Sequence, residues 1–203
     1  MFLVSSFWTS CRGAWVGLTV ALIFLILTAN CHRLKKWFLT LVFANILIFI
    51  PVLAGALYYF KGTKDGNRFL LYRGAWKMIK ENPILGKGLG TFMDHVSQYT
   101  NNFGAYYAHN CYLQIWAESG VFSLLCFIIF LGYIFYRCLW LICHIQASVN
   151  FYLLIGLTAS LLGFLINSFF DVHLYSFQLS FLFWTILGIT MALSFSLHQQ
   201  LKQ

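Results

Sequence analysis

Residues 121–143 read VFSLLCFIIFLGYIFYRCLWLIC, an apolar run whose single charge is Arg137 near one end. A bilayer core about 30 Å thick is crossed by about 20 apolar residues in a helix. The run has that length, and the long stem of Arg137 can carry its charge to the headgroups. It therefore predicts a transmembrane helix.

Four other uncharged runs are long enough for the same interpretation: Ala14–Ala29, Trp37–Phe60, Phe151–Phe170 and Phe177–Ser196. Backbone groups in lipid must be paired within the segment, so these runs predict helices. The expected fold is an all-α, polytopic integral membrane protein with about five transmembrane helices. It would form a single membrane domain over residues 1–203, with one long loop over residues 61–120 that carries amphipathic helices.

The composition supports a membrane protein and disfavours other classes. Hydrophobic residues make up 61% of the chain and charged residues only 9%, against about 25% charged in a soluble domain. The net charge of +8 comes mostly from basic residues near the ends of apolar runs, where lipid headgroups or lipid phosphates bind them. We therefore expect membrane lipids, and not nucleic acid, as partners. The six cysteines include no CxxC pair and are read as packing residues, so no metal site is predicted.

The segment between Phe60 and Val121 is the only long polar segment, and it holds seven of the thirteen basic residues. Residues 67–81 predict an amphipathic helix that Asn82-Pro83 ends. Its apolar arc contains Leu71, Tyr72, Ala75, Met78 and Ile79. Arg73, Lys77 and Lys80 form a basic stripe on the opposite side.

The orientation of this loop follows from the short connections. Arg33, Lys35 and Lys36 lie in a short connection, and basic residues in short loops favour the cytoplasmic side. Five basic residues fall on that side and eight on the other, but long segments cross the membrane with less regard to charge. The long loop is therefore predicted to lie outside the cytoplasm.

Gly86, Gly88 and Gly90 follow the predicted helix, but their spacing matches neither GxxxxGK[ST] nor GxGxxG. We interpret them as a flexible turn and not as a phosphate cradle. Residues 109–119 then predict an apolar-faced stretch near the membrane surface, before Gly120 opens the next span.

Among the six histidines, His109 stands beside Asn110 and close to several tyrosines at the predicted membrane surface. A histidine in such a chain is more often a packed residue than a base, and His173, beside Asp171 in a short turn, is a weaker candidate. Arginines at span edges are usually anchors. Arg12 has no other cation near it, however, and Arg73 heads the basic stripe. Planar guanidinium groups bind phosphate oxygens in pairs, so these two arginines could hold a pyrophosphate.

Two longer patterns carry a family resemblance. Residues 73–92 read RGAWKMIKENPILGKGLGTF, and residues 109–120 read HNCYLQIWAESG. Together they resemble the signature region of the O-antigen ligase and polymerase superfamily, and Ser10-Cys-Arg12-Gly-Ala is similar to its upstream Ser-Arg-Gly motif. Ser123 departs from the Gly, Thr or Tyr common in the family three positions after Gly120.

The resemblance implies a metal-independent, cofactor-free, inverting glycan transfer at the outer face of the bacterial inner membrane. The donor would be a saccharide on a polyprenyl pyrophosphate, and the acceptor a glycan or lipid A core. His109 would activate the acceptor hydroxyl, while Arg73 and Arg12 would hold the departing pyrophosphate. The further residues expected to bind substrate are Lys77, Lys80, Asn110 and His173.

Several alternatives remain beside the ligase. Family members typically have more spans, so the resemblance implies the C-terminal half of such a protein, as a truncated or split gene product or as a functional short form. A related polymerase, a protein-glycosylating relative and an inorganic-carbon transporter are the other functions to weigh. The cores of the five predicted spans contain essentially no Asp, Glu, Lys or Arg, which disfavours the transporter. A plain membrane anchor would not explain the Arg, His and Gly residues of the loop.

Overall fold

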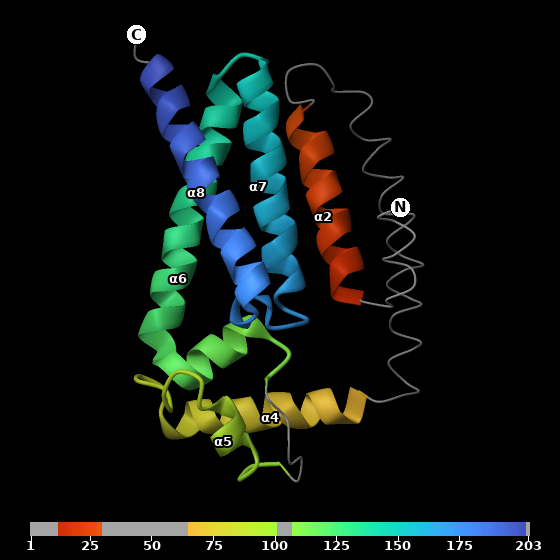
Figure 1. Cartoon of the computed structure of the whole chain (residues 1–203), viewed down its shortest axis with the longest axis vertical. Helices are drawn as coiled ribbons and strands as arrows, with labels where there is room; N and C mark the ends of the chain where they lie inside the picture. Colours follow the sequence, from red (N-terminus) through yellow and green to blue (C-terminus); the bar gives the residue numbers. More distant parts are fainter. Residues whose placement is uncertain (1–11, 30–64, 101–106, 202–203) are drawn as a thin grey trace. The chain divides into compact units, whose positions relative to one another are not determined.

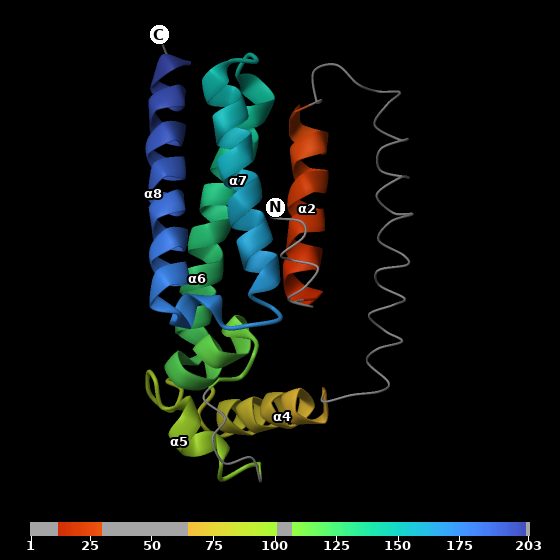
Figure 2. The same cartoon turned by 45° about the vertical axis from the view of Figure 1, so that its right-hand side comes forward.

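The computed structural model describes residues 12–29, 65–100 and 107–201, and every regular element in these ranges is helical (Figures 1 and 2). The elements are α2 (Arg12–Ala29), α4 (Asp65–Glu81), α5 (Phe92–Val96), α6 (Cys111–His144), α7 (Val149–Asn167), the 3-10 helix η1 (His173–Tyr175) and α8 (Phe177–Gln200). The predicted all-α class is confirmed.

Three of the described helices, α6, α7 and α8, are long and apolar enough to cross a bilayer, and α2 contains a shorter apolar helix over Gly13–Thr28. These four coincide with four of the five predicted spans. The fifth, Trp37–Phe60, lies outside the described residues. The chain is a multi-pass membrane protein.

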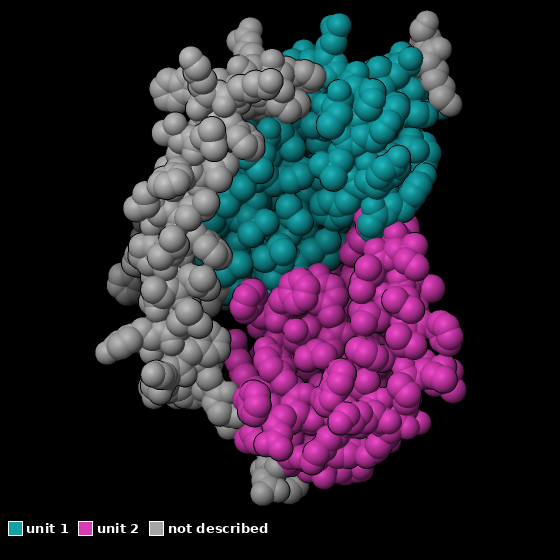
Figure 3. Space-filling model, turned by 180° about the vertical axis from the view of Figure 1, so that it is seen from behind, with its two compact units in different colours: residues 1–57, 132–167, 181–203 teal, residues 58–131, 168–180 magenta. Residues whose placement is uncertain are grey.

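The structure divides into two compact units, shown in separate colours in Figure 3. In the first unit, which includes α2 and α7, these two helices lie side by side (Figures 1 and 2). A Cβ atom added to Gly17 would lie 2.5 Å from the carbonyl oxygen of Gly163. Small residues allow two membrane helices to approach this closely, because there is no side chain to hold the backbones apart.

Arg137 lies in the same unit, near the end of the span quoted first. Its Nε donates a hydrogen bond to the Ser194 hydroxyl (3.1 Å), and its guanidinium lies 3.9 Å from the centre of the Phe195 ring. The charge of this span therefore interacts with a polar group and an aromatic face on α8.

The second unit comprises residues 58–131 and 168–180, and α4 supplies its core. Leu71, Ala75, Met78 and Ile79 are buried, as the predicted apolar arc requires, and Tyr72 is half-buried. The four buried residues pack with Phe92 and Val96 of α5 and with Ala108 and Ala117. The helix ends at Glu81, directly before Asn82-Pro83 as expected.

Helix α6 is interrupted at Gly120, whose backbone is not helical (φ 81°, ψ 174°). This residue separates the stretch 111–119 from the apolar run that starts at Val121, at the boundary predicted from the sequence. A Cβ on Gly120 would lie 1.9 Å from the Ile84 carbonyl oxygen. The left-handed φ and the close approach together require glycine here.

The predicted glycine turn is present, and backbone hydrogen bonds dock it on the first segment of α6. Lys87 N–H donates to the Ala117 carbonyl (2.9 Å) and Gly88 N–H to the Glu118 carbonyl (2.8 Å). Gly86 has φ 73°, and a Cβ there would lie 2.3 Å from the Glu118 carbonyl oxygen. Gly86 therefore allows the close backbone packing between this turn and residues 118–119.

Candidate active site

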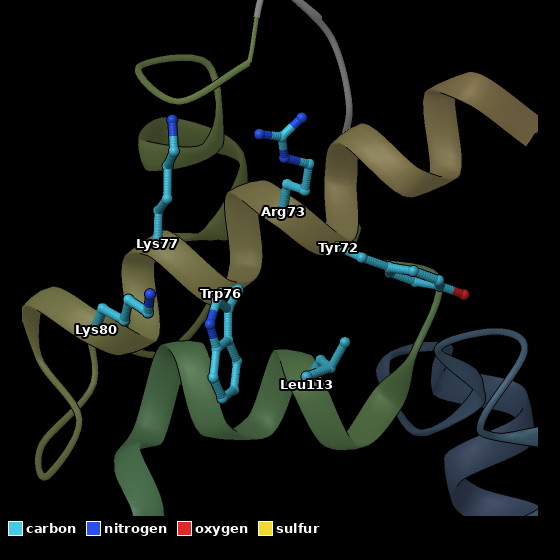
Figure 4. Close-up of a pocket in the computed structure, with 6 residues that line it drawn as sticks. All are labelled: Tyr72, Arg73, Trp76, Lys77, Lys80 and Leu113. Carbon is cyan, nitrogen blue, oxygen red and sulfur yellow. The ribbon is translucent and has the colours of Figure 1, made fainter.

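The basic stripe of α4 borders a pocket of about 430 Å³ in the second unit (Figure 4). Arg73, Lys77 and Lys80 line it and are exposed. Their spacing of four and three residues places them along one side of the helix. In Figure 4, Arg73 and Lys77 extend from the same side of α4. The pocket therefore presents several hydrogen-bond donors and positive charge to a ligand.

Aromatic and aliphatic side chains complete the same pocket. Tyr72, Trp76 and Leu113 line it with the basic residues, and Trp76 reaches toward α6 (Figure 4). The ring of Trp76 meets that of Trp116 edge-on, with centroids 5.7 Å apart. Trp116 is fixed in turn, because its Nε1 donates to the Pro83 carbonyl oxygen (3.1 Å). The site thus combines cationic groups with an apolar wall, as a charged lipid headgroup requires.

His109 occupies a constrained backbone position immediately before α6. Its φ of 53° is the single positive value among the described residues other than glycine, and such a conformation costs energy unless the surroundings hold it. Asn110 caps the helix, because its Oδ1 accepts hydrogen bonds from the N–H groups of Tyr112 and Leu113, both 3.0 Å. Ala108 N–H, on the other side, donates to Gln114 Oε1 (2.9 Å). Both neighbours of His109 are therefore fixed.

The imidazole of His109 is paired with Asp171, which lies in the turn between α7 and α8. His109 Nδ1 is 3.3 Å from Asp171 Oδ1, and both side chains are about two-fifths exposed. The Val172 N–H also donates to Asp171 Oδ1 (2.8 Å). The hydrogen bond from His109 lowers the pKa of Asp171 to about 2, assisted by the Val172 N–H and opposed by partial burial. Asp171 is therefore a carboxylate at neutral pH.

Tyr72 connects the basic pocket to His109. Its side chain lines the pocket, and its hydroxyl donates to the carbonyl oxygen of His109 (3.3 Å). A single tyrosine therefore spans from the cationic pocket to the backbone of the histidine.

Glu118 organises the surroundings of this region from a buried position, with 1% of its surface exposed. One carboxylate oxygen accepts from the Phe92 N–H and Gln114 Nε2, both 3.2 Å. The other accepts from the Gly90 N–H (3.1 Å) and the Tyr175 hydroxyl (2.9 Å). This carboxylate therefore ties the glycine turn, the first segment of α6 and the 171–176 turn together.

The structure brings together most of the residues predicted from the sequence. Arg73, Lys77 and Lys80 share one pocket, and Tyr72 bridges from that pocket to His109. Asn110 lies beside His109 as the cap of α6, so its predicted contact with substrate stays a prediction. His173 lies in η1, in the same turn as Asp171. Arg12 is the first residue of α2, which belongs to the first unit.

Sequence reasoning did not assign roles to Asp171, Glu118 or Tyr72. Asp171 is one of only five acidic residues and the only one after Glu118. A single carboxylate in a short turn between two spans was therefore a usable signal. The pairing with His109 could not be read from spacing, because the two residues are 62 positions apart. Tyr72 was placed on the apolar arc, which accounts for its ring and not for its hydroxyl.

Comparison with known proteins identifies a family for this chain. The family model described as O-antigen ligase matches residues 1–128, which is more than half of the chain. The chain belongs to the O-antigen ligase family. No curated protein and no solved structure matches it in the corresponding comparisons.

Membership of the O-antigen ligase family indicates a glycosyltransferase-type enzyme that acts on a lipid-linked glycan and an acceptor. The matched region contains the basic pocket and His109. The match ends before the 168–176 turn, so Asp171 and His173 lie outside it. The contact between His109 and Asp171 therefore joins the matched part of the chain to the part that follows it.

Proposed function

We propose that this protein transfers a saccharide from a polyprenyl pyrophosphate to a hydroxyl group of a glycan acceptor, such as a lipid A core. The observation that carries the proposal is the bridge made by Tyr72, which joins a cationic pocket suited to pyrophosphate to the histidine suited to deprotonate a hydroxyl. A transfer reaction needs both groups close to the anomeric carbon. The O-antigen ligase family supports the same reaction class.

The donor's pyrophosphate would bind at Arg73, Lys77 and Lys80. The guanidinium of Arg73 can donate two parallel hydrogen bonds to phosphate oxygens, whereas the lysines contribute point charges. Positive groups that are already in place stabilise the negative charge that develops on the leaving pyrophosphate. Trp76 and Leu113 would contact the apolar start of the lipid chain. The predicted role of Arg12 at the pyrophosphate stays a prediction from the sequence.

His109 would act as the general base. With Nδ1–H donating to Asp171, the second ring nitrogen, Nε2, is left to accept a proton. As the acceptor oxygen forms its bond to the anomeric carbon, the bond from that carbon to the pyrophosphate oxygen breaks. The electron pair leaves with the pyrophosphate, and the hydroxyl proton moves to Nε2. The carboxylate of Asp171 orients the ring and stabilises the imidazolium that forms, the role of the aspartate in serine protease triads.

Two substitutions test this assignment in cells that make the full chain. His109→Gln keeps a polar side chain but cannot take up a proton at neutral pH, and Arg73→Lys keeps the charge but loses the planar fork. Each should reduce glycan attachment at least about a hundredfold, the range expected for loss of a general base or of a bidentate phosphate contact. Lipid-linked donor should accumulate, because its consumption is blocked.

Matched controls are available for both variants. His198→Gln changes a histidine at the far end of α8, and Arg68→Lys changes an exposed arginine of α4 that does not line the pocket. Both should transfer glycan at the wild-type rate, with equal protein levels in the membrane. Near-normal transfer by His109→Gln would show that the acceptor hydroxyl is activated elsewhere.

The proposed location is the inner membrane, with residues 61–120 on its outer face. The basic residues of the short connection at positions 33–36 support this orientation. A cysteine placed at the exposed Gln98, after replacement of the native cysteines, should react with an impermeant thiol reagent in intact cells. If the cysteine reacted only after cell lysis, residues 61–120 would lie on the cytoplasmic side, and the proposed reaction would be contradicted.

A further inference from the structure

A second pocket in the same unit lies beside the His109–Asp171 pair. It has a volume of about 230 Å³ and is lined by Tyr107, Asp171, His173, Tyr175, Ser176 and Leu179, among others. Pockets for drug-sized ligands are about 300–1,000 Å³, so this one has room for one small ring and not for a chain of them. Asp171 borders it, which places any occupant next to the partner of His109.

Two tyrosine rings form an angled wall of this pocket. The rings of Tyr107 and Tyr175 have centroids 6.2 Å apart and are inclined by 58°. Tyr175 is held in place, because its hydroxyl donates to the buried Glu118 carboxylate (2.9 Å), and burial together with that carboxylate raises its pKa. Tyr107 is 42% exposed. The wall thus pairs a fixed aromatic ring with an accessible one.

The polar groups of the pocket favour hydroxyl groups over anions. Asp171 supplies carboxylate oxygens that accept hydrogen bonds, and Ser176 supplies a hydroxyl. Burial lowers the pKa of His173, which disfavours the charged form of this imidazole. A carboxylate without a neighbouring lysine or arginine in the lining repels phosphate and carboxylate ligands. The pyrophosphate of a donor therefore belongs in the basic pocket of α4 and not here.

A sugar ring fits this combination of groups. A pyranose has an apolar face of C–H groups, which packs on aromatic rings, and an edge of hydroxyl groups, which donate to carboxylates. We propose that this pocket binds one uncharged sugar ring of the acceptor and presents one of its hydroxyls to His109. The assignment of this ring to the acceptor rests on the proposed function. The preference for an uncharged ring rests on the pocket alone.

Direct binding tests the pocket without any transfer reaction. The probes are methyl glucoside and the methyl glycoside of glucuronic acid, measured by saturation-transfer NMR with the full chain in nanodiscs. Leu179→Trp fills the pocket, and Ile189→Trp is the matched control, because it makes the same change at an exposed position of α8 outside the pocket lining. Methyl glucoside should bind more strongly than the acidic glycoside. Leu179→Trp should weaken its binding by about tenfold, the scale of steric discrimination in a small pocket.

The outcomes separate this proposal from the proposed function. His109→Gln should bind methyl glucoside like the wild type, whether or not it transfers glycan. Equal binding by Leu179→Trp and Ile189→Trp, or preference for the acidic glycoside, would overturn the pocket assignment. In the transfer assay, Leu179→Trp should raise KM for the acceptor by about tenfold and leave KM for the donor unchanged. A rise in the donor KM alone would show that the ring belongs to the donor and would overturn the acceptor assignment.

Discussion

The two halves of the candidate site are built in different ways. The basic face of α4 comes from one helix, where Arg73, Lys77 and Lys80 are exposed and follow the helical period. The region around His109 is formed by residues 109–119 and the 171–176 turn. It is held by hydrogen bonds between residues 57 to 62 positions apart, Tyr175 to Glu118 and His109 to Asp171. The first half offers charge in an open pocket, and the second fixes one imidazole in one orientation.

This difference predicts which changes the protein tolerates. Exposed point charges near water are screened, and each one by itself contributes little to stability or to the binding of a ligand. A buried oxygen that accepts several hydrogen bonds contributes more to stability, because its removal leaves the buried donor groups without partners. We therefore expect the largest loss of stability at the buried Glu118 and the smallest effects on donor binding at the two lysines, Lys77 and Lys80.

The largest effect is expected at Glu118, which is buried and accepts four hydrogen bonds, two on each oxygen. Glu118→Gln replaces one acceptor oxygen by an NH₂ group, so two donors lose their partner whichever way the amide turns. Unsatisfied buried donors cost about 1–3 kcal/mol each, so the free energy of unfolding should fall by about 3 kcal/mol. Denaturant unfolding of the purified protein in detergent micelles measures this.

Glu81→Gln is the matched control for that variant. Glu81 has two hydrogen-bond partners, Lys87 (2.6 Å) and the Tyr99 hydroxyl, and its side chain is about half exposed. Its pKa is lowered, first by the hydrogen bond from Lys87 and next by that from Tyr99, yet solvent screens an exposed pair. The unfolding curve of this variant should stay close to that of the wild type. Equal destabilisation by the two variants would show that burial does not distinguish these carboxylates.

The same contrast explains what could be predicted from the sequence. Among the described residues, the structure has four predicted spans where expected, and likewise the α4 helix with its buried arc, its end at Asn82-Pro83 and the break at Gly120. These features depend on local periodicity or on glycine and proline chemistry. The contacts of Asp171 and Glu118 depend on how distant segments meet. No local pattern encodes such a meeting, so these partners became visible only in the folded chain.

An intermediate effect is expected at Asp171. Asp171→Asn keeps the size of the side chain but removes the charge, and the amide can face His109 with either its oxygen or its NH₂ group. The imidazole is then no longer held in one tautomer, so kcat should fall by about tenfold or more, while KM for the donor should not change. Asp94→Asn, an exposed change in α5, should leave both parameters as in the wild type.

The pH dependence of stability gives a second readout for Asp171. Its pKa is lowered from 3.8 to about 2 in the folded protein, chiefly by the hydrogen bond from His109. A depressed pKa stabilises the fold above the unfolded value and loses that effect as pH falls toward the folded value. The part of the stability difference between wild type and Asp171→Asn that comes from the carboxylate charge should therefore shrink between about pH 4 and pH 2. A difference that persists at pH 2 would place the origin of the effect outside the carboxylate charge.

The smallest effects are expected for the two lysines of the basic face. Lys77→Gln and Lys80→Gln each remove one exposed point charge from the pocket and leave the guanidinium of Arg73 in place. Each should raise KM for the donor by only about threefold, and added salt should shrink that difference, because mobile ions screen exposed charges. Arg68→Gln, on the same helix but outside the pocket lining, controls for the loss of net charge. If Lys77→Gln weakened donor binding as strongly as Arg73→Lys, the basic face would act as a diffuse charged patch. The bidentate geometry assigned to Arg73 would then carry no special part of the affinity.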